Sequence, residues 1–285
     1  MKKIMKICAM LLAGVMTVLS VGCSNNGAAS KKVKVVDIQL TQEEYAFGVQ
    51  KDDAELLAKV NEYIAKIKSD GTFDKICNKY FGDGEPTGVT SAALDSSKDQ
   101  LVVATNAAFE PFEYMKGDTY YGIDMEIAAG LAEYLGKELV ISNMDFDAVC
   151  LSVSQNKANV AMAGLTVKED RKEYVTFSDT YYNASQKLVV MESDTTFDSC
   201  KTAEDVEKVL NGLAASKVGC QNGTTGQKYI AGDEEWEFAG FSNLEAVGYK
   251  NGSLAVQDMI NGNIKFVVID EAPAKCIVDA MNKVG

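Results

Sequence analysis

Short apolar runs alternate with amphipathic stretches from Leu101 onward, and no other feature of the sequence constrains the fold as strongly. Strands are expected at 101–105, 138–142 and 159–163, with helices at 125–135 and 146–155. After an extended run at 181–192 the alternation restarts, with strands at 217–221 and 264–269 and helices near 203–210, 226, 243–248 and 253–260. Strands that alternate with helices form mostly parallel sheets flanked by helices. The sequence therefore predicts an α/β protein with two such units.

The part of the chain before Leu101 is organised differently. Strands are expected at 33–38 and 45–49, followed by a strongly amphipathic helix that begins after Asp52 or Asp53 and a shorter helix at 73–81. Residues 83–100 contain Pro86, two glycines, three serines and few apolar side chains. This composition is typical of a linker.

The N-terminus has the pattern of an export signal. Three lysines precede the uncharged apolar run 7–21, which is short for a membrane span. The run ends in Leu19-Ser20-Val21-Gly22-Cys23, which resembles the lipobox of bacterial lipoproteins, whose cysteine is acylated. We expect a signal peptide over 1–22, a lipid anchor at Cys23, a tether over 23–32 and a location outside the cytoplasm on the cell membrane. The alternative is a plain secretory signal.

Composition excludes several functions. The chain of 285 residues has a formal net charge of −13, and removing the signal would make it more negative, so nucleic acid is not an expected partner. Without histidine, Ser-His-Asp and Cys-His catalysis and histidine-containing metal sites are excluded. The five cysteines after Cys23 are an odd number at wide spacings, which predicts free thiols and no metal site.

Residues 163–174, AGLTVKEDRKEY, are the first candidate for a binding site. They follow a short apolar strand, and Thr166 is placed to begin a helix with Glu169 and Asp170 in its first turn. Free N–H groups at such a turn attract an anion. If the anion is a carboxylate, Arg171 could bind it as well, through two parallel hydrogen bonds. The alternative is an ordinary surface arginine on an acidic helix.

Three other places could contribute to a ligand site. Residues 223–226, Gly-Thr-Thr-Gly, lie between a strand and a helix and offer amides to an anion, although they match no nucleotide fingerprint and could be a tight structural turn. Asp270 ends a strand at the sheet edge where α/β folds bind ligands, or else it caps the next helix. Phe109 and Phe146 follow strands of the first unit and could stack on a ligand or belong to the core.

Six stretches together resemble the polar amino-acid binding proteins of bacterial ABC importers. They are LVVATNAAFEPFEY, YYGIDMEIAAGLAEYLG, MDFDAV, AGLTVKEDRKEYVTFSDTYY, VGCQNGTTGQKY and FVVIDEAPA. The resemblance implies a two-lobe, periplasmic-binding-protein-like fold of type 2, with two crossing strands between the lobes. It also implies a monomer without cofactor that closes on one free L-amino acid and delivers it to an ABC transporter permease.

Matching positions imply roles for one set of residues around the ligand carboxylate. Arg171 would bind the α-carboxylate, helped by backbone or hydroxyl groups of Gly164, Thr166 and Thr225. Thr224 belongs to the same turn as Thr225.

A second set would contact the rest of the ligand. Asp270 and the carbonyl of Ala163 would bind the α-ammonium group, and Phe109 and Phe146 would sandwich the side chain. Basic-amino-acid and glutamine binders commonly have an aspartate where this chain has Asn106. One negative charge is therefore missing, which favours a neutral polar ligand such as glutamine. The alternative is a cationic side chain, for which Glu110 or Glu113 would supply the missing charge.

The order of the segments departs from the family. Residues 43–82 resemble the segment that ends the chain in the family, yet here they come first. We interpret this as a circular permutation, with the first lobe formed by 45–82 and 101–187, the second by 33–44 and 188–285, and the old ends joined by 83–100. Lys32 and Gly285 should then lie side by side on the second lobe, helix 53–67 should pack on the first lobe, and 83–100 should have few buried contacts and be the most mobile part of the folded body.

One alternative function shares this fold. A cyclohexadienyl or arogenate dehydratase would use a carboxyl group in the pocket as a general acid. The lipobox and the amino-acid-binding motifs favour the binding protein, which has no catalytic step.

Overall fold

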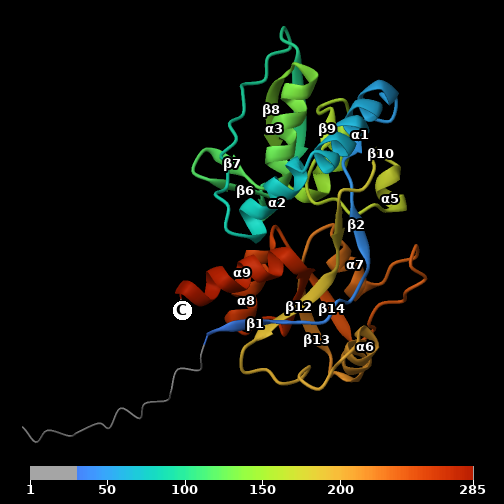
Figure 1. The fold of residues 1–285 in the computed structure, drawn as a ribbon. Helices are drawn as coiled ribbons and strands as arrows, with labels where there is room; N and C mark the ends of the chain where they lie inside the picture. The colour runs from blue at the N-terminus through green and yellow to red at the C-terminus, as the bar shows by residue number, and fades with distance from the viewer. Residues whose placement is uncertain (1–30, 285) are drawn as a thin grey trace, which may run out of the picture.

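The computed structural model describes residues 31–284, which form two α/β lobes (Figure 1). The sheet of the first lobe has the order β10-β3-β9-β4-β8. Its strands are β3 (Gly48–Val49), β4 (Gln100–Thr105), β8 (Glu138–Asn143), β9 (Val160–Ala161) and β10 (Thr176–Phe177). Strand β4 is parallel to β8 and β9, whereas β3 is antiparallel to β9 and β10. The short strand that follows β2 is thus built into a sheet whose other strands come much later in the chain.

The sheet of the second lobe has the order β1-β12-β15-β13-β14. Its strands are β1 (Val33–Val36), β12 (Gln186–Met191), β13 (Ser216–Gln221), β14 (Leu244–Tyr249) and β15 (Phe266–Asp270). Strand β13 is parallel to β14 and β15, and β12 is antiparallel to β15 and β1. The helices of this lobe are α6 (Ala203–Gly212), α7 (Thr225–Ala231), α8 (Gly252–Ile260) and α9 (Glu271–Val284). The predicted fold class, two α/β lobes whose sheets are flanked by helices, is confirmed. The sheets are mixed and not mostly parallel, because each has two parallel and two antiparallel pairings.

Helices and a small sheet cover the first lobe. They are α1 (Ala54–Ser69), α2 (Thr72–Phe81), α3 (Ile123–Leu135), the 3₁₀ turn η1 (Phe146–Ala148), α4 (Val149–Ser154), α5 (Glu169–Lys172) and strands β5 (Ala108–Phe109), β6 (Glu113–Lys116) and β7 (Thr119–Tyr121). Helix α1 packs against α3, where the hydroxyl of Tyr63 occupies the space that a Cβ on Gly130 would fill. The expectation that this amphipathic helix packs on the first lobe is confirmed.

Two antiparallel strands run between the lobes. Strands β2 (Glu43–Tyr45) and β11 (Tyr182–Ala184) pair with Tyr45 opposite Tyr182. Figure 1 shows β2 extending from the lower, second lobe toward the upper, first lobe. These are the crossing strands that the resemblance implies.

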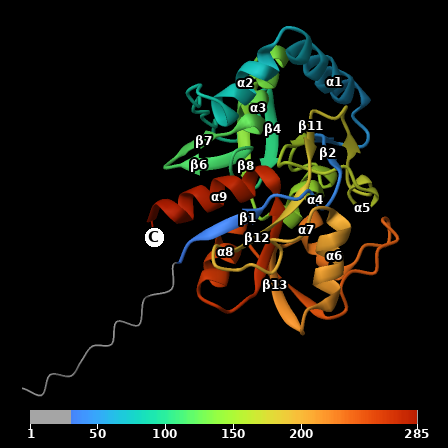
Figure 2. The same ribbon diagram turned by 60° about the horizontal axis from the view of Figure 1, so that its bottom comes forward.

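The two ends of the described chain meet on the second lobe. The N–H of Val33 donates to Asn282 Oδ1 at 2.9 Å, and Asn282 Nδ2 donates to the Val33 carbonyl at 2.9 Å. In Figure 2, β1 starts beside the C-terminal end of α9. The prediction that residues near Lys32 and near Gly285 lie side by side is confirmed for Val33 and Asn282, although Gly285 itself lies outside the described residues.

The linker 83–100 runs along the first lobe. Most of its residues are exposed, as expected, but Val89 is buried and exchanges two backbone hydrogen bonds with Tyr120. Farther along, the N–H of Ala92 donates to the Leu139 carbonyl at 2.9 Å. The segment is therefore held at points along its length.

Two local predictions were wrong. The helix predicted at 243–248 is instead strand β14 (Leu244–Tyr249), which pairs along its length with β13. Helix α5 begins at Glu169, three residues after Thr166, and has a single turn. Thr166 is therefore not a helix N-terminus, because residues 165–167 are extended and pair with residues 44–46 through backbone hydrogen bonds.

Several expectations fall on the N-terminus or on single side chains. The signal peptide, Cys23 and all but the last two residues of the tether lie outside the described residues. Cys77, Cys150, Cys200, Cys220 and Cys276 are free. Within residues 31–284, no helix is long and apolar enough to cross a membrane, and no three acidic or cysteine side chains are grouped to hold a metal ion.

Candidate ligand-binding site

Arg171 lies where the two lobes meet. Its Nη1 donates to the carbonyl of Thr166 at 2.8 Å in the first lobe, and its Nη2 donates to the carbonyl of Gly223 at 3.2 Å in the second. The guanidinium carbon lies 5.3 Å from the ring centroid of Phe146. A guanidinium has five N–H donors, so this arrangement leaves donors for an anion. Arg171 lines a pocket of about 230 Å³ with Phe146, Cys150 and Gly223.

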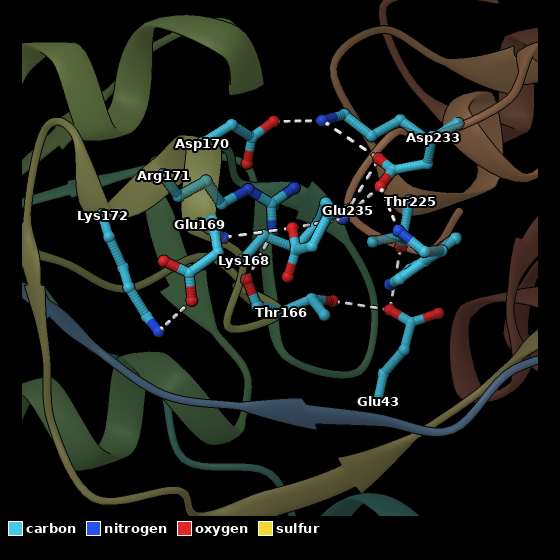
Figure 3. Close-up of polar contacts among 12 residues, drawn as sticks. Glu43, Thr166, Lys168, Glu169, Asp170, Arg171, Lys172, Thr225, Asp233 and Glu235 are labelled. Atoms are coloured by element: carbon cyan, nitrogen blue, oxygen red, sulfur yellow. Dashed lines mark hydrogen bonds and ion pairs between the residues drawn. The ribbon is translucent and has the colours of Figure 1, made fainter. Parts of the chain in front are cut away.

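A buried glutamate joins the threonines predicted from the two lobes. The hydroxyls of Thr166 and Thr225 donate to the same oxygen of Glu43, Oε2, at 2.6 and 2.8 Å (Figure 3). Glu43 is 6% exposed and lies on crossing strand β2. The neighbouring Thr224 is the N-cap residue of α7, and its hydroxyl bonds the Gln221 carbonyl at 2.9 Å. The structure therefore brings Thr166 and Thr225 together, whereas the Thr224 hydroxyl bonds within its own turn.

Asp270 lies at the carboxyl end of β15, as predicted. Its Oδ1 accepts a hydrogen bond of 2.5 Å from the Tyr45 hydroxyl, and the side chain is 5% exposed. Burial raises the pKa of Asp270 to about 7, and the charge of Glu43 adds to the shift. An opposite charge beside Asp270 would therefore be strongly favourable.

Gly164 and Ala163 form a tight part of the backbone beside Phe109. Gly164 has a φ of +54°, and a Cβ there would lie 2.8 Å from Phe109 Cε1. Its N–H donates to Asp124 Oδ2 at 3.0 Å, so this amide is already bonded within the protein. Burial raises the pKa of Asp124 to about 7, although this hydrogen bond opposes the shift. Ala163 is buried next to it, at 1% exposure.

Phe109 and Phe146 line different pockets. Phe109 faces a pocket of about 230 Å³ between the first lobe and α9, which includes Pro273 and Ile277. Phe146 lines the pocket of Arg171. The contact of Phe146 with the guanidinium stabilises the arginine through a cation–π interaction.

Asn106 links the lobes through its amide. Its Nδ2 donates to the Met144 carbonyl at 2.7 Å, and its Oδ1 accepts from Gln221 Nε2 at 2.9 Å. Gln221 is 2% exposed, and its Oε1 has no hydrogen-bond partner among residues 31–284. A buried carbonyl oxygen without a donor is unfavourable, so this position is suited to a ligand group that carries N–H.

A second set of contacts joins the lobes away from Asp270. We call Lys168, Asp170, Lys228, Asp233 and Glu235 the interlobe clamp. Lys168, which is 1% exposed, lies 3.1 Å from Asp233 and 2.8 Å from Glu235 (Figure 3). Asp170 pairs with Lys228 across the same interface. Burial raises the pKa of Asp233, but the hydrogen bond and charge of Lys168 outweigh this and hold it below its usual value.

Glu43, Gln221 and Lys168 were missed as site residues by the sequence interpretation. One signal could have found Glu43. In a strand, every second side chain lies on the same face, so Glu43 shares the face of the buried Tyr45, whereas Glu44 lies on the opposite face. Lys168 stands in a charged run typical of a solvated surface. Its partners come from the other lobe, and nothing in local sequence indicates them.

Curated relatives are named as amino-acid binding proteins. The chain is 33% identical over 114 residues to the arginine-binding extracellular protein ArtP of Bacillus subtilis, which covers 40% of this chain and 44% of that protein. It is 27% identical to ABC transporter arginine-binding protein 1 of Escherichia coli K12, over 62% of this chain and 65% of that protein. The histidine-binding periplasmic protein of the same strain is 24% identical, over 65% of each chain. The chain thus spans 44 to 65% of the length of these relatives.

Solved structures show the same similarity. Holo ArgBP from T. maritima has a TM-score of 0.54 and 31% identity, over 66% of this chain and 77% of that one. An ancestral arginine-binding protein bound to glutamine has a TM-score of 0.53 and 30% identity, over 66% and 76%. The ancestral amino acid-binding protein AncCDT-1, a precursor of cyclohexadienyl dehydratase, has a TM-score of 0.54 and 26% identity, over 64% and 75%.

The family itself follows from a match that covers most of the chain. Residues 6–83 and 101–272 match the family as two segments separated by the linker. The chain therefore belongs to the bacterial extracellular solute-binding proteins, family 3.

Proposed function

We propose that this protein binds one free L-amino acid between its lobes and delivers it to the permease of an ABC importer. The observation that carries the proposal is that a guanidinium and a buried carboxyl group both contact Thr166. Arg171 bonds the Thr166 carbonyl, while the Thr166 hydroxyl bonds Glu43, whose charge acts on Asp270. An α-amino acid is a zwitterion and needs an anion site and a cation site close together.

The side chain of the ligand ends in an N–H group in this proposal. Gln221 Oε1 needs a donor, and Asn106 beside it is neutral. The amide of L-glutamine meets both conditions, as the sequence interpretation favoured. The guanidinium of L-arginine is the competing donor, since relatives named as arginine-binding share the family. Aliphatic and acidic side chains do not supply this donor.

The remaining roles follow from the placement of the site residues. Arg171, with backbone groups of Thr166 and Thr225, binds the carboxylate, and Asp270 with the Ala163 carbonyl binds the ammonium group. Asn106 borders the side chain. Phe109 and Phe146, which line separate pockets in this structure, are proposed to contact it from opposite sides. The pairs of residues that bridge the lobes tie closure to the ligand, since each half of the site comes from a different lobe.

We also propose that the chain is a circularly permuted lipoprotein. Val33 and Asn282 are hydrogen-bonded, and the linker joins two elements of the first lobe, α2 and β4. These contacts support the division predicted from the sequence. The first lobe consists of 45–82 and 101–187, and the second lobe consists of 33–44 and 188–285. A lipid on Cys23 would attach the monomer to the outer face of the membrane through its second lobe.

A titration screen tests the proposed function. The twenty amino acids, cystine and ornithine are added to the purified protein, and the shift of its thermal unfolding and the heat of binding are measured. Tight binding of L-glutamine or L-arginine is expected. A preference for an aliphatic or acidic amino acid would overturn the side-chain assignment, and binding of none would overturn the function.

The dehydratase alternative rests on the raised pKa of Asp270, because a general acid must hold a proton near neutral pH. Product analysis with prephenate and arogenate decides between the two. Any turnover would favour the enzyme.

A further inference from the structure

Glu43 lies between the lobes on a strand that belongs to neither of the two large sheets. Its side chain is 6% exposed, and four donors surround its carboxylate. Thr41 and Gln186 donate to Oε1 at 2.6 and 3.1 Å. Thr166 of the first lobe and Thr225 of the second donate to Oε2 at 2.6 and 2.8 Å. This number of donors matches an ionised carboxylate, which only accepts hydrogen bonds.

The direction of these hydrogen bonds determines what the threonines can offer a ligand. A hydroxyl has one proton, and Thr166 and Thr225 both donate theirs to Glu43. The oxygen of Thr225 also accepts from Gln186 Nε2 at 2.9 Å. Among residues 31–284, no donor reaches the hydroxyl oxygen of Thr166. That oxygen can therefore accept a hydrogen bond from a ligand but cannot donate one.

A second carboxyl group, that of Asp270, lies close enough to Glu43 to be affected by its charge. Tyr45 is two residues from Glu43 on β2, and its hydroxyl donates to Asp270, which is 5% exposed. The guanidinium of Arg171 contacts Thr166 at its carbonyl, not its hydroxyl. The region where the lobes meet thus has an acceptor side, with Glu43 and Asp270, and a donor side, with Arg171.

We propose that Glu43 is an unassigned binding-site residue that makes the Thr166 hydroxyl an acceptor and, with Asp270, selects the cationic ammonium group of the ligand. The proposal deepens the proposed amino-acid binding and rests on it. The sequence predicted that backbone or hydroxyl groups of Thr166 and Thr225 help to bind the ligand carboxylate. Neither hydroxyl can do so, because each donates its only proton to Glu43. The three N–H groups of the ammonium then have three acceptors, which are Asp270, Thr166 Oγ1 and the Ala163 carbonyl. The negative charge of Glu43 further favours the cation.

Ligands with and without an α-amino group test the proposal. The probes are L-glutamine and L-arginine, together with glutaramic acid and 5-guanidinopentanoic acid, which lack only that group. In Glu43→Gln the new amide N–H₂ can donate to the threonine oxygens, so the hydroxyl of Thr166 is no longer restricted to accepting. Calorimetry should show affinity for the amino acid reduced about 10- to 100-fold, as for one lost charge-assisted contact. Affinity for the des-amino probe should stay within about threefold.

Glu44→Gln is the matched control. Glu44 is the next residue on β2, is exposed, and accepts a hydrogen bond only at 3.2 Å from Thr180 among the described residues. It should bind all probes as the parent does. Thr166→Val is the second variant, because it removes the acceptor and keeps the Glu43 charge, and it should show the same selective loss if Glu43→Gln does not fold.

Equal losses for the amino acid and its des-amino probe in both variants would overturn the proposal, because Glu43 would then only hold the lobes together. Unchanged affinities would overturn it as well. If the parent protein binds no amino acid, the proposed function fails, which the screen reveals before any variant is made.

Discussion

Replacing Lys168 by methionine tests whether the interlobe clamp contributes to ligand affinity. Lys168 is 1% exposed and lies 4.3 Å from the ring centroid of Trp236, so a methionine of similar length can keep the apolar contacts. Removing one member of a buried ion pair costs about 3 to 5 kcal/mol. Asp233 retains Lys228 at 3.4 Å and Glu235 is partly exposed, which reduces the expected cost to about 2 to 3 kcal/mol.

This cost falls on the closed arrangement of the lobes, because both carboxylates come from the second lobe and Lys168 from the first. If the ligand binds only the closed arrangement, and that arrangement is a minor one without ligand, the whole cost appears in the affinity. Calorimetric titration with the amino acid found in the screen should give a Kd about 30- to 150-fold weaker.

Lys172→Met is the matched control. Lys172 lies one turn further on α5 and pairs with Glu169 at 2.5 Å on the exposed surface of the same lobe. It should bind the amino acid with the affinity of the parent. If Lys168→Met and Lys172→Met bind equally tightly, the clamp does not contribute to closure and the reasoning is refuted.

Three further changes have expected outcomes. Arg171→Ala should weaken amino-acid binding at least about a hundredfold, from a cost of about 3 to 5 kcal/mol, and unchanged calorimetric affinity would remove Arg171 from the site. Because the native protein raises the pKa of Asp270 from 3.8 to about 7, this group should destabilise the unliganded protein as pH rises from about 4 to about 7. The affinity for the amino acid should instead rise with pH until about pH 7, by at most about tenfold per pH unit. Asp270→Asn should bind weakly and without this pH dependence. An affinity of the parent that does not change with pH would contradict the assignment. Gly164→Ala should lower the Tm by about 2 to 8 °C or more, because Phe109 contacts the added Cβ at a φ of +54°. Gly136→Ala, at a φ of +68° with no atom within 4 Å, should lower it less, and equal losses would exclude the contact as the cause.

The spacing of apolar residues predicted the helices and strands that bury one apolar face. Helix α1 was predictable because Val60, Ile64 and Ile67 recur at helical spacing, and Asp53 caps it by accepting from the Leu56 N–H at 2.9 Å. Strand β14 was not, because it is an edge strand whose residues Glu245 and Gly248 are exposed. Its pairing with β13 provides the structure that local propensity does not.

Sequence motifs pointed to only part of the candidate site. Arg171 and Asp270 stand at positions that resemble the family, and the structure places them at the meeting of the lobes and at the end of β15. Glu43 could not be distinguished from Glu44 by residue type. What separates them is the tertiary arrangement, in which hydroxyls from two distant segments converge on one of the two carboxylates.

The course of the linker makes the molecule suited to division into two pieces. Residues 83–100 leave α2 and enter β4, both in the first lobe, so this segment does not pass between the lobes as β2 and β11 do. Ser96 and Ser97 lie in an exposed turn between the points at which the segment is bonded to the lobe. A fluorescent protein inserted there, or two fragments expressed separately on either side, would leave the crossing strands uncut. The linker is thus a suitable place to attach a reporter that tests the proposed lobe closure, because the crossing strands stay unchanged.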